Sequence, residues 1–167
     1  VPMGDPAGIG PEITVKSFLN SEVLEAANSI VVGDKKIIDK ALEITGTDLQ
    51  VNVIKEVEEA DFSSNAINLI DLNNIDTKTF EFGEVQKQCG KAAFEYIEHA
   101  IKLAMDGKVD AMATTPINKE SLKAAEVPFI GHTEMLEELT NSHDPLTMFQ
   151  VRSLRIFFLT RHLSVKA

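Results

Sequence analysis

Apolar and polar positions along the chain follow two periods, one typical of buried strands and one typical of amphipathic helices. Continuous apolar runs at Ser29–Asp34, Val51–Ile54 and Ile67–Asp71 predict strands. Between the first two runs, Lys35–Thr45 carries apolar residues at helical spacing and stops at Gly46, a residue type that commonly follows a helix. This alternation predicts an α/β fold in α/β/α layers, with a mostly parallel sheet covered by helices on both faces.

The second half of the chain predicts the longest helix, from about Glu84 to Asp106, because one apolar stripe recurs there at helical spacing. Val109–Thr115 then predicts a central strand that Pro116 stops. No repeat or linker interrupts the pattern, so no internal domain boundary is predicted. Four shorter elements are predicted to follow: helices at Asn118–Ala125 and Thr133–Thr140, and strands at Thr147–Val151 and Arg155–Thr160.

The first residues combine a strand end, a glycine-rich turn and a helix start. Val1–Met3 is apolar, the turn Gly4–Gly10 follows, and Pro11 and Glu12 suit the first turn of a helix. Open α/β sheets bind ligands at such turns, although a purely structural turn is the competing interpretation. The glycine spacing matches neither a dinucleotide fingerprint nor a Walker A loop, which disfavours a nucleotide-binding kinase.

Composition narrows the classes of partner. The 167 residues are 44% hydrophobic and 25% charged, as in an ordinary globular domain, and the formal net charge of -10 argues against nucleic acid as a ligand. The single cysteine, Cys89, is expected in the core, which fits a reducing compartment. No apolar run is long enough to cross a membrane, so we expect a cytoplasmic protein with no membrane partner.

Polar residues collect just past the predicted strand ends. They form the turn Gly4–Gly10, the segment Thr114–Lys119 and the pair Arg161–His162, and a fourth segment, Gly131–Glu134, lies between two predicted helices. The carboxyl ends of parallel strands meet at one edge of a sheet, so at least three of these segments are expected to share a cleft.

Several side chains in these segments are candidates for acting on a ligand. Asp5, Asn118 and Lys119 are candidate catalytic residues, and Lys119 stands out because a cation near a helix start is mildly unfavourable. An ordinary solvated lysine is the alternative. In the fourth segment, Thr133 is expected to cap the following helix, so a structural role competes with a ligand role for His132.

One further histidine is a candidate metal ligand. His162 follows the last predicted strand, where a neutral imidazole would suit a divalent metal, although a lone histidine is more often structural. The sequence has no His-x-x-x-His, Glu-x-x-His or cysteine pair, so local spacing alone builds no complete metal site. Acyl hydrolysis has no support, because there is no Gly-x-Ser-x-Gly elbow.

Taken together, four segments resemble a known family. Gly4–Glu12, Thr115–Lys119, Val127–Glu134 and Leu159–Leu163 are similar to motifs of the 4-hydroxythreonine-4-phosphate dehydrogenases of vitamin B6 biosynthesis, in the same order and spacing. The resemblance implies that residues 1–167 are the amino-terminal portion of a longer two-domain subunit. It implies an α/β/α fold related to isocitrate and isopropylmalate dehydrogenases, and a homodimer whose active site lies in the interdomain cleft.

The resemblance also implies residue roles and a reaction. His132 and Thr133 would contact the substrate, and His162 would be one of three histidine ligands of a divalent zinc, magnesium or cobalt ion. The remaining ligands, and most contacts to NAD or NADP, would lie beyond residue 167. The implied reaction is oxidation of 4-phosphooxy-L-threonine to a β-keto acid, which decarboxylates to 3-amino-2-oxopropyl phosphate in pyridoxal phosphate biosynthesis.

Departures from the family pattern leave the substrate open. Thr115 stands where the family often has Gly or Ala, Arg161 where it commonly has Thr, and Ser164-Val165 replaces a frequent Pro-Leu. The first alternative is the same chemistry on a four-carbon sugar acid phosphate, D-threonate or D-erythronate 4-phosphate, which lacks the amino group. The second is a non-catalytic α/β domain that binds a phosphorylated small molecule through the turn Gly4–Gly10 and needs no metal.

Overall fold

The computed structural model describes residues 1–143, 145–160 and 164–166. The helices are α1 (Gly10–Ser17), α2 (Ser21–Ala26), α3 (Lys35–Thr45), α4 (Lys87–Met105), α5 (Lys119–Ala124) and α6 (His132–Leu139), with a 3₁₀ turn at Val57–Glu59. The strands are β1 (Ile30–Gly33), β2 (Gln50–Ile54), β3 (Ala66–Asp71), β4 (Met148–Val151) and β5 (Leu154–Phe157).

The main sheet is parallel, with strand order β1-β3-β2. The first residues extend this sheet beyond β1, because Pro2 forms a parallel bridge with Val32. The Val32 N–H donates to the Val1 carbonyl, and the Met3 N–H donates to the Val32 carbonyl, both at 2.9 Å. All of β1 is buried, as its continuous apolar run predicts. The predicted α/β class with a parallel sheet is thus confirmed.

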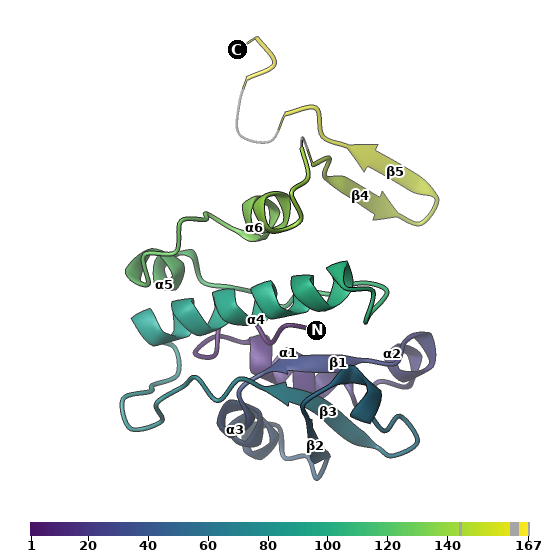
Figure 1. The fold of residues 1–167 in the computed structure, drawn as a ribbon, viewed down its shortest axis with the longest axis vertical. Coiled ribbons are helices and arrows are strands. Elements are labelled where there is room, and N and C mark those ends of the chain that lie inside the picture. The colour runs from purple at the N-terminus through teal and green to yellow at the C-terminus, as the bar shows by residue number, and fades with distance from the viewer. Residues whose placement is uncertain (144, 161–163, 167) are drawn as a thin grey trace.

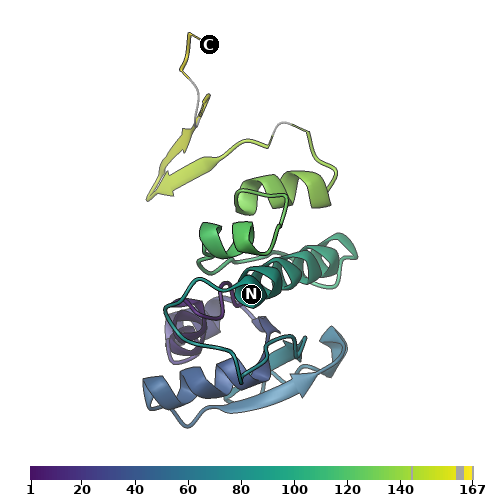
Figure 2. The ribbon, with the colours of Figure 1, turned by 90° about the vertical axis from the view of Figure 1, so that its left-hand side faces the viewer.

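Helix α4 is the central layer of the molecule. It contacts β1 on one side and α5 and α6 on the other, and Figures 1 and 2 both show it between the sheet and the two later helices. Its packing against α5 is close, because a Cβ atom added at Gly90 would lie 1.9 Å from the carbonyl oxygen of Ser121. Four buried side chains, Ile97, Ile101, Leu122 and Met135, form a small core that joins these three helices.

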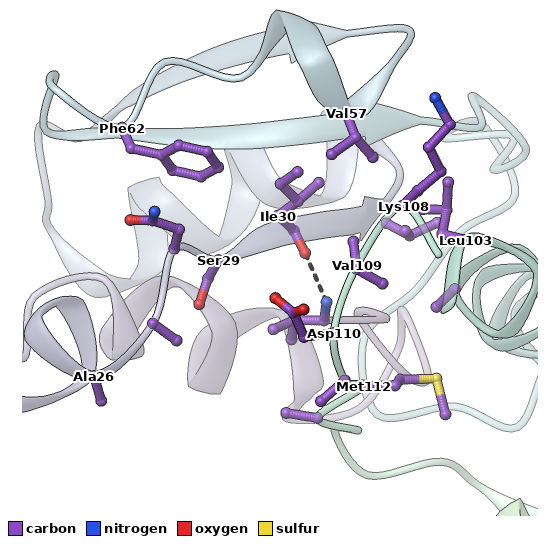
Figure 3. A pocket seen from close by; sticks show the side chains of 17 residues that line it. Ala26, Ser29, Ile30, Val57, Phe62, Leu103, Lys108, Val109, Asp110 and Met112 are labelled. Carbon is purple, nitrogen blue, oxygen red and sulfur yellow. Dashed lines mark hydrogen bonds between the residues drawn. The ribbon is translucent and has the colours of Figure 1, made fainter. Parts of the chain in front are cut away.

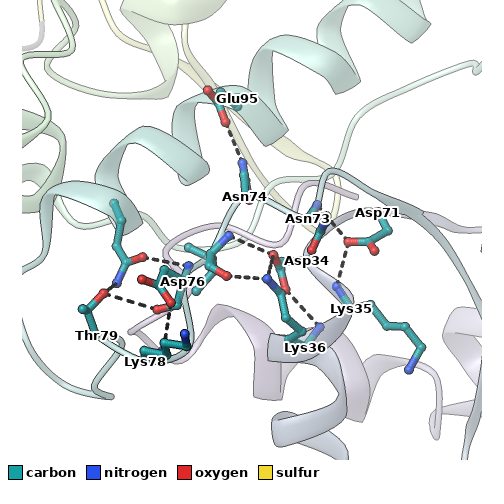
Figure 4. Close-up of polar contacts among 12 residues, drawn as sticks. Asp34, Lys35, Lys36, Asp71, Asn73, Asn74, Asp76, Lys78, Thr79 and Glu95 are labelled. Carbon is teal, nitrogen blue, oxygen red and sulfur yellow. Dashed lines mark hydrogen bonds and ion pairs between the residues drawn. The ribbon is translucent and has the colours of Figure 1, made fainter.

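Polar side chains at the carboxyl edge of the sheet are used to fasten loops (Figure 4). The Asp71 carboxylate, at the end of β3, accepts hydrogen bonds of 3.0 Å from the backbone N–H groups of Lys35 and Asn73. The next residue, Asn74, reaches α4, where the Tyr96 hydroxyl donates to its side-chain oxygen at 2.7 Å. These contacts hold the loop after β3 in place and serve the fold.

One sequence-based prediction about strands is wrong, and another is confirmed. Val109–Thr115 forms no strand, and residues 111–118 run as irregular chain. A cavity separates part of this segment from β1, and its Thr115 hydroxyl bonds to the Pro2 carbonyl, so no ladder to a neighbouring strand forms. The two strands predicted after α6 are present as β4 and β5, and they form an antiparallel hairpin that is separate from the parallel sheet.

Helix α2 is an element that the sequence pattern did not predict. It has six residues, none of them buried, so no apolar period marks it. Its start is set by Asn20, whose side-chain oxygen accepts a hydrogen bond of 2.9 Å from the Glu22 N–H. Within the described part of the chain, no helix is long and apolar enough to cross a membrane.

Candidate functional site

The glycine-rich turn forms a tightly wound connection into α1. The Asp5 carboxylate accepts a hydrogen bond of 2.8 Å from the Ala7 N–H, and the Gly8 N–H donates to the Asp5 carbonyl at 3.0 Å. Helix α1 then begins at Gly10 with no side-chain cap at Ile9. Gly8 and Ile9 are exposed, so the turn presents its tip to solvent beside a helix start, where anions are favoured.

The segment that follows the long helix is seated against this turn. The Asp5 N–H donates to the Pro116 carbonyl at 3.0 Å, and the buried Thr115 hydroxyl donates to the Pro2 carbonyl at 3.0 Å. Two segments more than a hundred positions apart in the sequence therefore touch. The turn Gly4–Gly10 and the segment Thr114–Lys119 thus lie together, which is one part of the expectation that at least three polar segments share a cleft. The cleft itself stays a prediction, because Arg161-His162 lies outside the described residues.

The two candidates at the end of this segment have different surroundings. Asn118 caps α5, because its side-chain oxygen accepts hydrogen bonds from the Glu120 N–H at 2.8 Å and the Ser121 N–H at 3.1 Å. Its oxygen is thus committed to the fold. Lys119 is exposed, and its Cε lies 4.0 Å from where a Cβ atom of Gly131 would stand. Of the two, Lys119 is the side chain placed beside the start of α6.

Helix α6 starts directly at the His-Thr pair. Its N-cap is Gly131, in extended conformation and without a side-chain cap, so the expectation that Thr133 caps this helix is wrong. The physical reason is one of position: Thr133 is the second residue of the helix and cannot occupy the preceding cap. The first N–H groups of α6 and the Thr133 hydroxyl are therefore donors at a helix start.

The His132 side chain is half-buried, and one of its two ring nitrogens lies in an unusual environment. Its Nε2 is buried and has no hydrogen-bond partner within the described residues. Burial lowers the pKa of the imidazole, and a hydrogen bond to the Thr115 backbone opposes this effect only in part. The neutral ring is therefore favoured near pH 7, and Nε2 is left to interact with whatever binds beside it.

Asp5 does not have the surroundings of a group that acts on a ligand. Its side chain is almost fully buried, at 3% exposure, and is directed to the turn through its bond to Ala7. Burial raises the pKa of the carboxyl group, and hydrogen bonds within the turn offset this only in part. Asp5 therefore shapes the turn, whereas the exposed tip at Gly8 and Ile9 is open to a ligand.

The candidate metal ligand His162 and its neighbour Arg161 lie outside the described residues. Among the residues that are described, no three His, Cys, Asp or Glu side chains are grouped so as to hold a metal ion. The donor set for a divalent metal is therefore incomplete in this part of the chain.

Cys89 is buried in the core, as predicted, and burial raises the pKa of its thiol to about 12, which makes it a structural residue.

A cavity of about 640 Å³ lies away from these residues, between β1 and residues 108–113 (Figure 3). Its lining is mostly apolar and includes Phe62 and Val57. The Val1 nitrogen, also in the lining, donates to the Ile30 carbonyl at 2.6 Å. No predicted site residue that the structure describes borders this cavity, so it is not part of the candidate site.

Comparison with known proteins places these residues in a family context. The family model described as "Pyridoxal phosphate biosynthetic protein PdxA" matches residues 25–167. Curated relatives from Fusobacterium nucleatum and Halalkalibacterium halodurans, both named "Putative D-threonate 4-phosphate dehydrogenase", are 55% and 60% identical over 166 residues. These matches cover 99% of this chain and 50% of each relative, so the chain spans about half the length of the curated relatives it matches.

Solved structures give the same picture of the fold. A 4-hydroxythreonine-4-phosphate dehydrogenase from Burkholderia phymatum matches with a TM-score of 0.92 at 36% identity. The enzyme of that name from Klebsiella pneumoniae matches with a TM-score of 0.90 at 38% identity. Each match covers 99% of this chain and 50% of the other. Likeness at this level extends over both the sheet and the later helices.

Proposed function

The chain belongs to the PdxA family of pyridoxal phosphate biosynthetic proteins, and from this premise we propose that it supplies substrate-contacting residues to a nicotinamide-dependent dehydrogenase. The substrate class we propose is a four-carbon hydroxy acid phosphorylated at its far end. One structural observation carries the proposal: the segment Thr114–Lys119 is bonded to the glycine turn at Pro116 and lies beside the uncapped start of α6 at Lys119. Backbone donors and a cation gathered there suit an anionic ligand.

Of the substrates in this class, D-threonate 4-phosphate is the one we propose. The relatives that carry this name are 55% and 60% identical to the chain, whereas the structures named for 4-hydroxythreonine 4-phosphate are 36% and 38% identical. This reverses the order of the two substrates in the sequence-based expectation. 4-Phosphooxy-L-threonine remains the second candidate, supported by the names of the structural relatives and of the family.

In this proposal, the described residues bind and orient the substrate. His132 and Thr133 contact it from the start of α6, where the Thr133 hydroxyl and the free backbone N–H groups donate to its negatively charged oxygens. Lys119, beside Gly131, contributes a positive charge to the same place. The neutral His132 ring holds or donates one proton without adding a second buried charge.

The reaction follows from the substrate's carbon skeleton. Oxidation of the hydroxyl β to the carboxylate gives a β-keto acid, with the hydride transferred to the nicotinamide cofactor and a proton released. Loss of carbon dioxide from D-threonate 4-phosphate oxidised in this way leaves dihydroxyacetone phosphate, and from 4-phosphooxy-L-threonine it leaves 3-amino-2-oxopropyl phosphate. The cofactor, NAD or NADP, supplies only the redox chemistry, so the residues named above set the orientation.

Three further parts of the proposal rest on the family resemblance. We propose His162 as one ligand of a divalent zinc, magnesium or cobalt ion, whose other ligands are not found among the described residues. A homodimer and a cytoplasmic location stay predictions. So does the assignment of residues 1–167 to the amino-terminal portion of a two-domain subunit.

The proposal is tested by following NADH absorbance in the full-length protein. D-threonate 4-phosphate and 4-phosphooxy-L-threonine are supplied separately, each with NAD or NADP and with each metal ion. We expect turnover with D-threonate 4-phosphate, loss of turnover with a chelator, and recovery when metal is restored. Turnover of only the amino acid phosphate would overturn the substrate assignment, and no turnover of either by folded protein would overturn the dehydrogenase assignment.

A pair of histidine variants tests the site itself. His132→Asn is expected to lower kcat/KM by about 100-fold or more, because it removes a group that we place against the substrate. His143→Asn, at an exposed position in the loop after α6, is the matched control and is expected to keep full activity. Equal activity of the two variants would remove His132 from the site.

A further inference from the structure

The antiparallel hairpin of β4 and β5 has one face made of apolar side chains alone. Its register pairs Phe149 with Ile156 and Val151 with Leu154. Side chains alternate between the two faces of a strand and directly paired residues share a face, so these four point to the same side. The ring of Phe158, whose centroid lies 4.8 Å from that of Phe149, extends this surface. We call the surface formed by the two pairs the apolar hairpin face.

The opposite face of the hairpin has a different composition. It carries the pair Gln150 and Arg155, whose amide and guanidinium groups interact well with water, and the pair Met148 and Phe157. One wholly apolar face and one partly polar face are typical of an antiparallel sheet that is covered on one side only. The sequence of the hairpin therefore indicates which side is to be buried, namely the apolar hairpin face.

Residues 1–143, 145–160 and 164–166 leave this face uncovered. Phe149, Val151 and Leu154 are 58%, 62% and 60% exposed, and Ile156 is 43% exposed. Figures 1 and 2 both show the hairpin beyond α6, away from the main sheet. A two-stranded hairpin is marginally stable by itself in water, and a contiguous apolar patch of this kind marks a surface that binds a partner.

Chain length and surface area favour one partner over another. The chain covers 50% of each curated relative, so those proteins have about as many residues outside the matched region as within it. The family resemblance places those residues after position 167, close in sequence to the end of β5 at Phe157. A second copy of the chain is the competing partner. The apolar hairpin face offers on the order of 500 Å², however, whereas a stable interface buries about 800 Å² on each partner.

We propose that the apolar hairpin face is the docking surface for the part of the full-length protein that follows residue 167. That part lays an apolar helix or sheet face on the hairpin, which therefore belongs to a second packing unit and not to the layers around α4. The boundary between the two units then falls between the end of α6 at Leu139 and the start of β4 at Met148. The inference goes beyond the proposed function and does not depend on the substrate or the cofactor.

Photo-cross-linking in the full-length protein identifies what covers the face. Phe149 is replaced by the photoreactive analogue p-benzoylphenylalanine, which keeps an aromatic ring on the apolar hairpin face. Irradiation is expected to give a product with the mass of one chain, in which position 149 is joined to a peptide beyond residue 167. The same analogue at Gln150, the neighbour on the opposite face, is the matched control and is expected to lose this product.

Four results of this experiment would overturn the proposal. A product with the mass of two chains would make a second copy the partner, and a product joined within residues 1–167 would return the hairpin to the layers around α4. Absence of any product from folded protein would mean that the face stays exposed, and equal yields from positions 149 and 150 would mean that the two faces do not differ. If the variant at Phe149 does not fold, the analogue is placed at Ile156 on the same face and judged in the same way.

Thermal unfolding of the full-length protein provides an independent readout. Val151→Asp places a carboxylate in the apolar hairpin face, and Gln150→Asp places one at the adjacent position on the other face. We expect Val151→Asp to unfold at least about 5 °C below Gln150→Asp, because burying a carboxylate without a partner is costly. Equal unfolding midpoints would overturn the proposal. So would conversion of a dimeric parent into a folded monomer with an unchanged midpoint, since the face would then serve contact between copies.

Discussion

The buried carboxylate of Asp34, at the end of β1, accepts a hydrogen bond of 3.0 Å from the N–H of Ile75, which lies 41 positions later. Its other oxygen accepts the Lys36 N–H at 2.9 Å and so caps α3 (Figure 4). The Lys36 ammonium lies 3.6 Å from the same carboxylate and also donates to the Ile75 carbonyl. One side chain thus fastens a helix start to the loop after β3.

Removing this carboxylate is expected to destabilise the protein strongly. Asp34→Ala loses a helix cap and leaves the buried Ile75 N–H unpaired, which together cost about 2–4 kcal/mol in the free energy of unfolding. Asp39→Ala removes the partly exposed partner of Lys35 and is the control, expected to cost less than about 1 kcal/mol. Urea unfolding followed by circular dichroism measures both, and equal losses would show that the Asp34 contacts contribute little.

Gly4 and Gly8 belong to the same turn, but replacement by alanine should destabilise the protein only at Gly4. Gly4 has a φ of +74°, and a Cβ atom there would lie 2.3 Å from the Pro116 carbonyl oxygen, so Gly4→Ala is expected to cost more than about 3 kcal/mol. At Gly8 the nearest atom would lie 3.5 Å away, which is ordinary contact, so Gly8→Ala should leave the unfolding midpoint nearly unchanged. Comparable midpoints for the two variants would contradict the close approach of Pro116.

The sequence predicted the elements whose periodicity is set locally. Lys35–Thr45 forms α3 with the predicted bounds, and Gly46 follows it with a φ of +64°, because an amphipathic stripe and a left-handed C-cap are both local properties. Residues 109–115 show where this reasoning fails. Their apolar run fits a strand, but a strand also needs a partner along its edge, and these residues lie beside a cavity and the first residues of the chain.

The candidate site was predictable as a set of segments but not as a set of contacts. The glycine turn and Thr114–Lys119 were expected to meet, and they do. The contact of Thr115 with the Pro2 carbonyl was not predicted, because the two residues are 113 positions apart in the sequence. Spacing along the chain does not reveal contacts between distant residues. The local sequence signal at this position is that Thr115 directly precedes a proline, Pro116.

Replacing Asp5 tests whether this residue has a structural or a catalytic role. Burial raises the pKa of its carboxyl group, so the folded state binds a proton more tightly than the unfolded state. Stability is therefore lost as pH rises from the ordinary aspartate pKa through the raised one. Asp5→Asn keeps the acceptor for the Ala7 N–H without this charge, and should be at least as stable as the unmodified protein at pH 7.

Two measurements on Asp5→Asn distinguish the roles. Unfolding in urea between pH 4 and 8 should show a smaller decline of stability with rising pH than in the unmodified protein. NADH formation by the full-length enzyme should change less than about 10-fold, as for a residue remote from the reacting atoms. A folded Asp5→Asn variant with no turnover would return Asp5 to the catalytic residues.

His132 should make the fold sensitive to mild acid. Its pKa is lowered by burial, so below the ordinary histidine pKa the unfolded state binds protons more readily than the folded state. Stability is therefore complete above that pKa and is lost as pH falls from it toward the lowered value. His99, on α4, is also lowered by burial and contributes in the same direction.

The expected result is a smaller acid response when His132 is replaced. Between pH 7.5 and pH 5.5, the free energy of unfolding should fall less for His132→Gln than for the unmodified protein, and least for His132→Gln combined with His99→Gln. His143→Gln is the control, since His143 is exposed and its replacement should leave the response unchanged. If all four proteins lose the same stability over this range, the His132 ring is not held in a buried, neutral state.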